Sequence, residues 1–238
     1  MTKTFIVAEI SVNHNGSYTE AARLIHAAAK IEVDAVKFQA WQYSTFPKLA
    51  EFHILPETLY ELASHYEQSH QIKWFVTPFD IDTAHFFRNQ KIWKIPSNKA
   101  VWKNEQLIDL ILEYSAGKEL IVSSGIQSVQ EILEFTKRVP QGTNLTILHC
   151  VSKYPTKPQH ADLERITTLR ENIPYEIGFS DHSGLPEMSV AAVVLGARII
   201  ECHITRNKKQ VGPDHKSSLE PDEFADMIRM VRNVEKGL

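Results

Sequence analysis

Two histidines stand near the ends of apolar, strand-like runs, and each follows another polar residue by two positions. His182 follows Ser180 in the segment IGFSDHSG, and His203 follows Glu201 in ARIIECHIT. Because side chains alternate between the two faces of a strand, each pair shares one face. Two imidazoles with open remaining positions suit a divalent ion such as Mn²⁺, Zn²⁺ or Fe²⁺. Metal ligation is one hypothesis, and a hydrogen-bonded structural role for each histidine is the other.

Two lysines lie inside other apolar runs, Lys37 in DAVKFQ and Lys94 in KIWKIPS. Lysines are seldom fully buried unless they meet an anion. Hydroxyl groups stand at the ends of further runs, namely those of Thr77, Ser97, Ser123 and Ser180. If the runs converge, two ammonium groups and a set of hydroxyls would surround a phosphate, or a phosphate and a carboxylate. The alternative is that each lysine pairs with a carboxylate such as Glu9 or Glu201.

These residues need elements that bring them together, and the chain supplies eight units of the same kind. Each unit is a β-rich run followed by a polar turn and an amphipathic helical pattern. The strand-like runs cover residues 4–12, 34–39, 73–79, 91–97, 119–125, 144–152, 175–183 and 197–205. The helical patterns that follow them cover residues 17–32, 55–70, 82–90, 104–117, 128–139, 161–172, 185–196 and 220–237.

Strict alternation of strand and helix favours parallel strands joined by crossover helices. Eight such units in 238 residues are close to the usual size of a closed (β/α)₈ barrel, or TIM barrel. An open, doubly wound sheet is the competing architecture. We favour an α/β barrel that forms a single domain over residues 1–238, because the count is eight and no linker interrupts the chain.

Polar residues gather at the C-terminal ends of the runs, whereas the N-terminal halves are almost purely apolar. In a barrel these ends meet on the face where catalytic groups lie. The sequence thus predicts one site at that face. Residues 41–54 form the longest irregular stretch, and we expect them to be a lid or a substrate wall.

Composition argues against several other classes of protein. The formal charge is −3, from 26 basic and 29 acidic side chains, so nothing favours nucleic acid or an anionic membrane as a partner. No apolar run approaches the roughly 18 to 20 residues of a membrane span, and the N-terminus does not resemble a signal peptide. The two cysteines, Cys150 and Cys202, form no CxxC pair and no disulfide scaffold. We expect a soluble protein in a reducing, cytoplasmic setting.

Nine segments, in order, resemble the sialic acid synthase family, that is, the N-acetylneuraminate synthases and their relatives. They are AEISVNHNGS, DAVKFQ, FVTPFD, KIPS, VSSGI, CVSKYPT, GFSDHSG, GARIIECHIT and GPDHKSSLEP. The resemblance spans nearly the whole chain. It implies a (β/α)₈ barrel that condenses phosphoenolpyruvate with an N-acetylated aldose, uses a divalent metal ion and releases phosphate. It is also compatible with a homodimer.

The resemblance further implies roles for individual residues. The metal ion, Mn²⁺ first and otherwise Mg²⁺, Co²⁺ or Zn²⁺, falls on His182 and His203. Glu9 and Asp214 are the candidate proton carriers, and the sequence does not choose between them. The phosphoenolpyruvate site falls on Lys37, Thr77, Lys94, Ser97, Ser123, Ser152, Tyr154 and Ser180. The acceptor sugar falls on Gln39 and Phe79, beside the two candidate proton carriers.

Two departures from the family concern the acceptor half of the site. Family members usually carry a C-terminal antifreeze-like domain that supplies an arginine to the partner subunit, whereas this chain stops at Leu238, after the last barrel helix. A separate capping protein, or an acceptor that needs no cap, would account for this difference. The segment KIPSNK also has Lys99 where family members usually have a glutamate that contacts the sugar. An acceptor with an acidic group near Lys99 is therefore one expectation.

Three functional hypotheses stay open on sequence alone. The first is a synthase of a sialic-acid-like nonulosonic acid, with an acceptor like N-acetylmannosamine or a different, acidic aldehyde. The second is a catalytically silent protein that keeps the phosphate and metal pocket. The third is another barrel lyase or aldolase.

Overall fold

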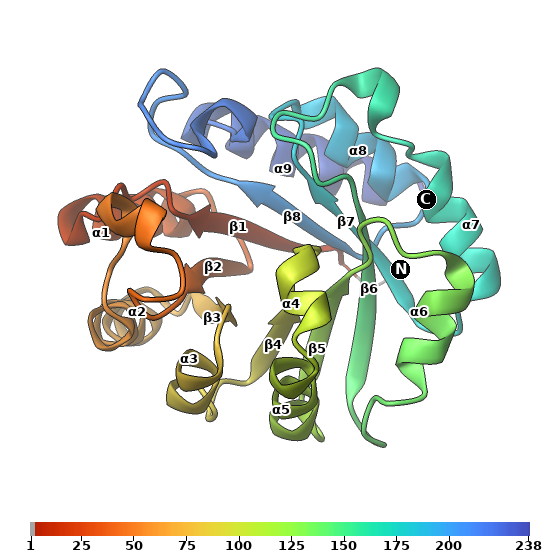
Figure 1. The fold of residues 1–238 in the computed structure, drawn as a ribbon. Coiled ribbons are helices and arrows are strands. Elements are labelled where there is room, and N and C mark those ends of the chain that lie inside the picture. Colours follow the sequence, from red (N-terminus) through yellow and green to blue (C-terminus); the bar gives the residue numbers. More distant parts are fainter. Residues whose placement is uncertain (1–2) are drawn as a thin grey trace.

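The computed structural model describes residues 3–238, which form eight strands with helices between them (Figure 1). The strands are β1 (Phe5–Ser11), β2 (Ala35–Ala40), β3 (Lys73–Pro78), β4 (Ile92–Ile95), β5 (Glu119–Ser123), β6 (Asn144–Cys150), β7 (Glu176–Asp181) and β8 (Ile199–His203). The α-helices are α1 (Tyr18–Lys30), α2 (Pro56–His70), α3 (Ile81–Phe86), α4 (Lys99–Lys103), α5 (Glu105–Ser115), α6 (Val129–Thr136), α7 (Glu164–Asn172), α8 (Pro186–Val194) and α9 (Pro221–Glu235). Three short 3₁₀ helices are η1 (Pro47–Phe52), η2 (Pro158–His160) and η3 (His215–Ser217).

All strand pairs are parallel, and the strand order is β3-β2-β1-β8-β7-β6-β5-β4. The first strand pairs with the last, and the two strands at the ends of this order, β3 and β4, lie against each other. The strands therefore form a ring, and the helices surround it (Figure 1). The predicted (β/α)₈ barrel is confirmed. The open sheet is wrong, because it would leave β3 and β4 apart.

Alternation along the strands sorts their side chains into an inner and an outer set. Outward residues such as Val36, Phe38 and Ile200 pack with the helices in the large core. Inward residues form a small apolar layer across the ring, made of Val7, Ala35, Phe75, Ile92, Ile121, Leu148 and Ile199, with Phe5 packed against it. Further along the same strands, toward their C-terminal ends, the inward residues become polar. The apolar layer is therefore the floor beneath a polar site.

Hydrogen bonds from the Gln90 side chain, in place of a strand ladder, connect β3 with the segment before β4. Gln90 is only 8% exposed. Its amide oxygen accepts a hydrogen bond from the backbone N–H of Val76 at 2.9 Å, and its amide nitrogen donates to the Val76 carbonyl at 3.2 Å. Within residues 3–238, β3 and β4 share no ladder of their own. Gln90 thus satisfies backbone groups on the side of β3 that faces β4.

Two local features differ from the sequence-based expectation, and one matches it. Residues 41–54 are not wholly irregular, because Pro47–Phe52 forms η1 and Phe52 packs in a small cluster with Val12 and Trp41. The short helix α4 was not predicted; the Asn98 side chain caps its first turn. Ser128 followed by Glu131 three positions later is the sequence pattern of a capping box, and this capping box does begin α6.

None of the helices within residues 3–238 combines the length and the apolar character that crossing a bilayer requires.

Candidate active site

Two lysines and two glutamates meet inside the barrel, directly above the apolar layer. Lys37 on β2 forms a close ion pair with Glu9 on β1, and its Nζ lies 3.6 Å from Oε2 of Glu201 on β8. Lys94 on β4 approaches the same Oε2 atom at 3.4 Å. All four residues are at most 5% exposed. We call these four residues the lysine–glutamate cluster; this pairing is the one that the sequence analysis kept as the alternative to anion binding.

Hydroxyl groups from neighbouring strands contact both lysines. The Nζ of Lys94 donates to Oγ of Ser123 on β5 at 2.5 Å, and the Nζ of Lys37 donates to Oγ1 of Thr77 on β3 at 3.2 Å. Both hydroxyl-bearing side chains are buried. An ammonium group has three donors: Lys94 combines one carboxylate and one hydroxyl contact, and Lys37 combines two carboxylate contacts and one hydroxyl contact. The sequence predicted this convergence of cations and hydroxyls.

Three further predicted residues extend the polar surface outward. Ser180 on β7 is buried and donates to Oε1 of Glu201 at 3.0 Å. Ser97 follows β4 and Ser152 follows β6, and the Ser152 hydroxyl donates to the Ser97 hydroxyl at 2.8 Å. Ser97 is half-buried and Ser152 is exposed. These serines therefore connect the buried cluster with the rim of the barrel.

The two predicted histidines lie next to each other, with 5.6 Å between their ring centroids. Nδ1 of His182 lies 2.7 Å from the backbone carbonyl oxygen of Val151. A carbonyl only accepts, so this nitrogen carries the proton and Nε2 of the neutral ring keeps a lone pair. Nδ1 of His203 is buried without a hydrogen-bond partner among residues 3–238, and it lies 3.7 Å from Oδ2 of Asp214. Nδ1 of His203 is thus a nitrogen atom that no hydrogen bond within residues 3–238 uses, and Nε2 of His182 is one that can accept.

Burial keeps both imidazoles neutral. Burial, together with the neighbouring His203, lowers the pKa of His182 to about 4. Burial also lowers the pKa of His203, although Asp214 opposes this. Neutral imidazole is the form that binds a metal ion. Within residues 3–238 no group of three His, Cys, Asp or Glu side chains is arranged to hold a metal ion. The residues present therefore fit a two-histidine site whose other positions are open to substrate or water.

Tyr154 covers the histidine pair from the β6 side. Its ring stacks on His182 with 4.2 Å between centroids, and its hydroxyl group donates to Nε2 of His182 at 3.1 Å. Burial of the hydroxyl group raises the pKa of Tyr154, and the charge of Asp214 raises it further. The phenol is thus a hydrogen-bond donor at neutral pH, although the residue as a whole is 46% exposed. Tyr154 thus covers Nε2 of His182.

Charge interactions in the lysine–glutamate cluster shift two further pKa values. Burial alone would raise the pKa of Glu201, but the charges of Lys37 and Lys94 outweigh it and bring that pKa to about 2. Burial lowers the pKa of Lys37 to about 8, with the charge of Lys94 acting in the same direction and Glu201 opposing both. Glu201 is therefore a permanent anion, whereas Lys37 loses its charge in mildly alkaline solution.

The predicted acceptor residues are less closely connected to this site. Lys99 is exposed at the first position of α4 and forms no ion pair or side-chain hydrogen bond with residues 3–238. Phe79 packs against Trp41 and Phe46, with centroid separations of 6.4 and 5.6 Å. Gln39 is half-buried near the end of β2, two positions after Lys37. The residues predicted to bind the anion and the metal ion thus lie together, whereas the residues predicted to bind the acceptor form no comparable cluster.

Two residues contribute more than the sequence suggested. Glu201 was considered only as a partner for a lysine, yet it links two lysines and a serine; its place two positions before His203 was the available signal. Ser11 was not singled out. Its φ angle is positive, at 49°, at the point where the β1 ladder becomes irregular. Its backbone N–H donates a hydrogen bond to the Glu9 carboxylate at 2.7 Å, and its hydroxyl group donates to the Asp214 carboxylate at 2.6 Å. Serine seldom adopts this backbone conformation, so nothing in the residue types indicates it.

Comparisons with known proteins cover nearly the whole chain. The model of the NeuB family matches residues 42–238. The chain is 32% identical over 265 residues to the N,N'-diacetyllegionaminic acid synthase of Campylobacter jejuni, an alignment that covers all of this chain and 78% of that protein. It is 33% identical over 258 residues to the N-acetylneuraminate-9-phosphate synthase of Mus musculus, covering 98% of this chain and 71% of that protein.

A solved structure gives the same picture of the fold. The N-acetylneuraminic acid (sialic acid) synthetase of Leptospira borgpetersenii, in complex with citrate, has a TM-score of 0.90 to this chain at 30% sequence identity. The match covers 99% of this chain and 85% of that one. The likeness therefore includes the whole barrel, from β1 to α9.

Proposed function

The chain belongs to the NeuB family, and on this basis we propose that it condenses phosphoenolpyruvate with an aldose resembling N-acetylmannosamine. The products would be a nonulosonic 2-keto acid and phosphate. The observation that carries this proposal is a pair of buried ammonium groups, Lys37 and Lys94, among hydroxyl groups where the barrel strands end. The names of the relatives, which are synthases of diacetyllegionaminic acid and of N-acetylneuraminate 9-phosphate, support a sugar-derived acceptor.

Phosphoenolpyruvate carries a phosphate and a carboxylate, and both need fixed cations. Lys37 and Lys94 are the buried cations of the site, and Ser123 and Thr77 lie within hydrogen-bond distance of them. When the substrate binds, the ammonium donors turn from Glu201 toward its oxygen atoms. Holding both anionic groups orients the enol carbon toward the aldehyde, and such positioning supplies a large part of the rate enhancement in reactions of two substrates.

The reaction requires one proton to be delivered and one to be removed. The enol carbon forms a bond with the aldehyde carbon, and the aldehyde oxygen takes up a proton to become a hydroxyl group. Water then adds to the carbon that bears the phosphate and loses a proton, after which phosphate leaves by C–O cleavage. We assign the proton transfers to Asp214, because Glu9 is held in its ion pair with Lys37. Ser11 contacts both carboxylates and orients them.

His182 and His203 would hold a divalent metal ion, for which Mn²⁺ is the first candidate and Mg²⁺, Co²⁺ and Zn²⁺ are the others. When bound, such an ion supplies Lewis acidity toward the aldehyde oxygen. The hydrogen bond from His182 to the Val151 carbonyl fixes the ring and its tautomer. Tyr154 has to swing away from Nε2 of His182 before that nitrogen can act as a ligand.

The acceptor would lie on the side of the barrel mouth formed by the ends of β2, β3 and β4. Gln39 lies near the end of β2 and offers an amide group. Phe79 follows β3 and offers an apolar surface. Lys99 is the exposed cation that follows β4. An aldose with a phosphate or carboxylate group would reach Lys99 better than a neutral one, so both kinds belong in any substrate panel.

The test is a product assay with defined components. The purified chain is incubated with Mn²⁺, phosphoenolpyruvate and a panel of aldoses that includes N-acetylmannosamine and its 6-phosphate. Released phosphate and the 2-keto acid product are measured together. We expect equal amounts of the two products, and a loss of at least about 100-fold in rate for Lys94→Met. Lys30→Met, which changes an exposed lysine at the end of α1, should leave the rate unchanged.

The metal assignment has its own control. His203→Ala should abolish the dependence of the rate on Mn²⁺, whereas His65→Ala, on the exposed side of α2, should not. Tight phosphoenolpyruvate binding with no product from any aldose would contradict the synthase and support a silent binding protein. Neither binding nor turnover of phosphoenolpyruvate would support another barrel lyase or aldolase.

A further inference from the structure

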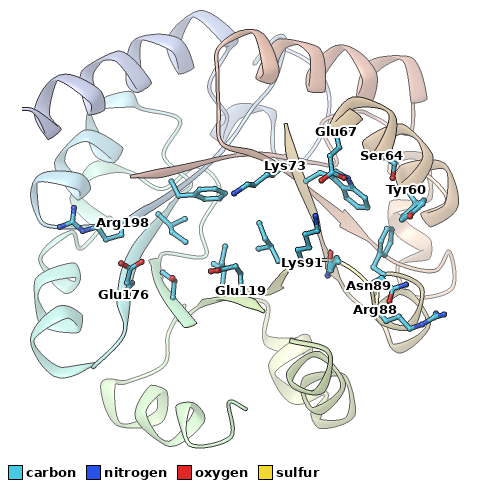
Figure 2. A pocket seen from close by; sticks show the side chains of 18 of the residues that line it. Tyr60, Ser64, Glu67, Lys73, Arg88, Asn89, Lys91, Glu119, Glu176 and Arg198 are labelled. Carbon is cyan, nitrogen blue, oxygen red and sulfur yellow. The ribbon is translucent and has the colours of Figure 1, made fainter. Parts of the chain in front are cut away.

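A cavity of about 870 Å³ lies at the end of the barrel opposite the candidate active site (Figure 2). Its lining includes the first residues of several strands, among them Phe5, Lys73, Ile92 and Glu119. The candidate active site uses the last residues of the same strands. Cavities that bind small molecules have volumes of roughly 300 to 1,000 Å³, so this one is of suitable size for a ligand.

The floor and one wall of this cavity are apolar. The floor consists of Phe5, Ile92, Ile121 and Ile199, which belong to the apolar layer of the barrel interior or pack against it. The wall is a group of aromatic rings between α2, β3 and α3, made of Tyr60, Trp74, Phe86 and Phe87. Tyr60 is 48% exposed and Phe86 is 37% exposed. A ligand here would therefore cover aromatic surface that now faces water.

The rim of the cavity carries more cations than anions. Its cationic residues are Lys3, Lys73, Arg88, Lys91 and Arg198, and its carboxylates are Glu67, Glu119 and Glu176. Two of the three carboxylates already accept hydrogen bonds, Glu67 from the Trp74 indole at 3.0 Å and Glu119 from the Asn144 amide at 2.8 Å. One cation, Lys3, pairs with Asp34 outside the cavity at 2.9 Å, so four cations remain against three carboxylates and the rim stays net positive.

Four of the five cations form no ion pair within residues 3–238, and the guanidinium of one of them, Arg88, donates to the backbone carbonyl of His85 at 3.1 Å. Lys73, Lys91 and Arg198 form no ion pair and no side-chain hydrogen bond with residues 3–238. The close contact of Lys73 is with an aromatic ring, because its Nζ lies 5.4 Å from the ring centroid of Phe5. Figure 2 shows the side chains of Lys73 and Lys91 directed over the mouth of the cavity. Both ammonium groups thus lie above the apolar floor.

We propose that this cavity binds a small amphipathic anion, namely an apolar ring or chain that ends in a carboxylate, phosphate or sulfonate group. The apolar part would lie on Phe5 and Ile199 and against the aromatic wall, and the anionic group would meet Lys73 and Lys91. The N-terminal end of a barrel does not carry its catalytic groups, so this site is separate from the candidate active site. The proposal does not depend on the reaction that we propose above.

The test uses two fluorescent probes of the same shape that differ in charge. 1-Anilinonaphthalene-8-sulfonate is an amphipathic anion, and N-phenyl-1-naphthylamine is the same ring system without the sulfonate. We expect one anionic probe to bind per chain. The double variant Lys73→Glu/Lys91→Glu should raise its dissociation constant at least tenfold, because the variant removes two cations at the mouth. The neutral probe should bind the wild type and this variant equally, since the apolar lining is unchanged.

A matched control carries the same net charge as the test variant. Lys103→Glu/Lys157→Glu reverses two exposed lysines that follow β4 and β6 and do not line the cavity, and it should change the dissociation constant less than twofold. Melting curves verify that both variants are folded. An equal loss in both variants, displacement of the anionic probe by phosphoenolpyruvate, or no binding to the wild type would each overturn the proposal.

Discussion

Glu201 holds two ammonium groups within 3.6 Å of one carboxylate oxygen, and all three side chains are buried in the barrel. Removing one member of a buried ion pair leaves the remaining charge poorly compensated, which typically destabilises a protein by about 3 to 5 kcal/mol. We therefore expect Lys94→Met to lower the free energy of unfolding by about 3 kcal/mol, the smaller value because Lys37 still faces Glu201. Urea denaturation measures this change.

The matched control for this stability prediction is again Lys30→Met, which should change the free energy of unfolding by less than about 0.5 kcal/mol. If the free energy of unfolding of Lys94→Met equals that of the wild type, then Glu201 does not depend on Lys94, and the cluster is not the coupled unit described above.

The lowered pKa of Lys37 predicts how substrate affinity depends on pH. Burial lowers this pKa to about 8, so the side chain is charged below pH 8 and neutral above it. An anionic substrate needs the charged form, and the dissociation constant of phosphoenolpyruvate should rise about tenfold between pH 7 and pH 9. Calorimetric titrations at several pH values check this, and Lys37→Arg should flatten the dependence because arginine keeps its charge. A flat profile in the wild type would contradict it.

Residue types predicted which groups meet, but not which of them pair. Lys37, Lys94 and the hydroxyl-bearing residues were identified because polar side chains inside apolar runs require partners. Whether a lysine meets a carboxylate or leaves its donors for a ligand depends on distances of a few tenths of an ångström between strands, which no spacing along the chain encodes. Strand alternation also predicts that Asp181 points away from the face shared by Ser180 and His182, and its carboxylate accepts hydrogen bonds from Ser183 and Ser189 in the next loop and helix.

Among the structural elements, repetition made the strands and most helices predictable. Eight apolar runs with polar ends, each followed by a helical pattern, leave few architectures other than a barrel. Elements that depend on one or two residues were not predictable. The helix α4 is five residues long and depends on a cap from Asn98, and η1 forms where aromatic residues such as Trp41 and Phe52 pack together. Short segments of this kind are set by tertiary contacts more than by propensity.

The junction between β3 and β4 is another feature that the sequence did not reveal, and it yields a prediction. Gln90→Leu keeps the approximate size of the side chain but removes both hydrogen bonds to the Val76 backbone. The buried N–H and carbonyl groups of Val76 would then lack these partners, and we expect a loss of about 2 to 4 kcal/mol in the free energy of unfolding. Urea denaturation measures it, with Gln130→Leu on the exposed face of α6 as the control. Equal stability of the two variants would mean that the junction does not need Gln90.

At the scale of the whole molecule, the barrel separates two chemically different ends. One apolar layer lies between the polar groups at the C-terminal face and the charged rim of the opposite cavity. The sequence predicted the first end, because polar residues at the ends of parallel strands must meet on one face. It did not predict the second, because Lys73, Glu119 and Glu176 are charged first residues of the kind that exposed strand ends commonly have. Only the closed ring gathers Lys73, Lys91 and Arg198 around one opening.

A ligand at the C-terminal face should stabilise the entire barrel, since its proposed contacts come from strands on both sides of the β3–β4 junction. Lys37 and Thr77 lie on β2 and β3, whereas Lys94 and Ser123 lie on β4 and β5. A ligand that binds only the folded state, at 100 times its dissociation constant, adds about 2.7 kcal/mol to the free energy of unfolding. For a chain of this length that corresponds to a rise of about 5 to 10 °C in Tm. Phosphoenolpyruvate should produce this rise in the wild type and not in Lys94→Met, and calorimetric melting measures both. An equal rise in the two proteins would mean that phosphoenolpyruvate binds elsewhere, and the lysine–glutamate cluster would then not be its site.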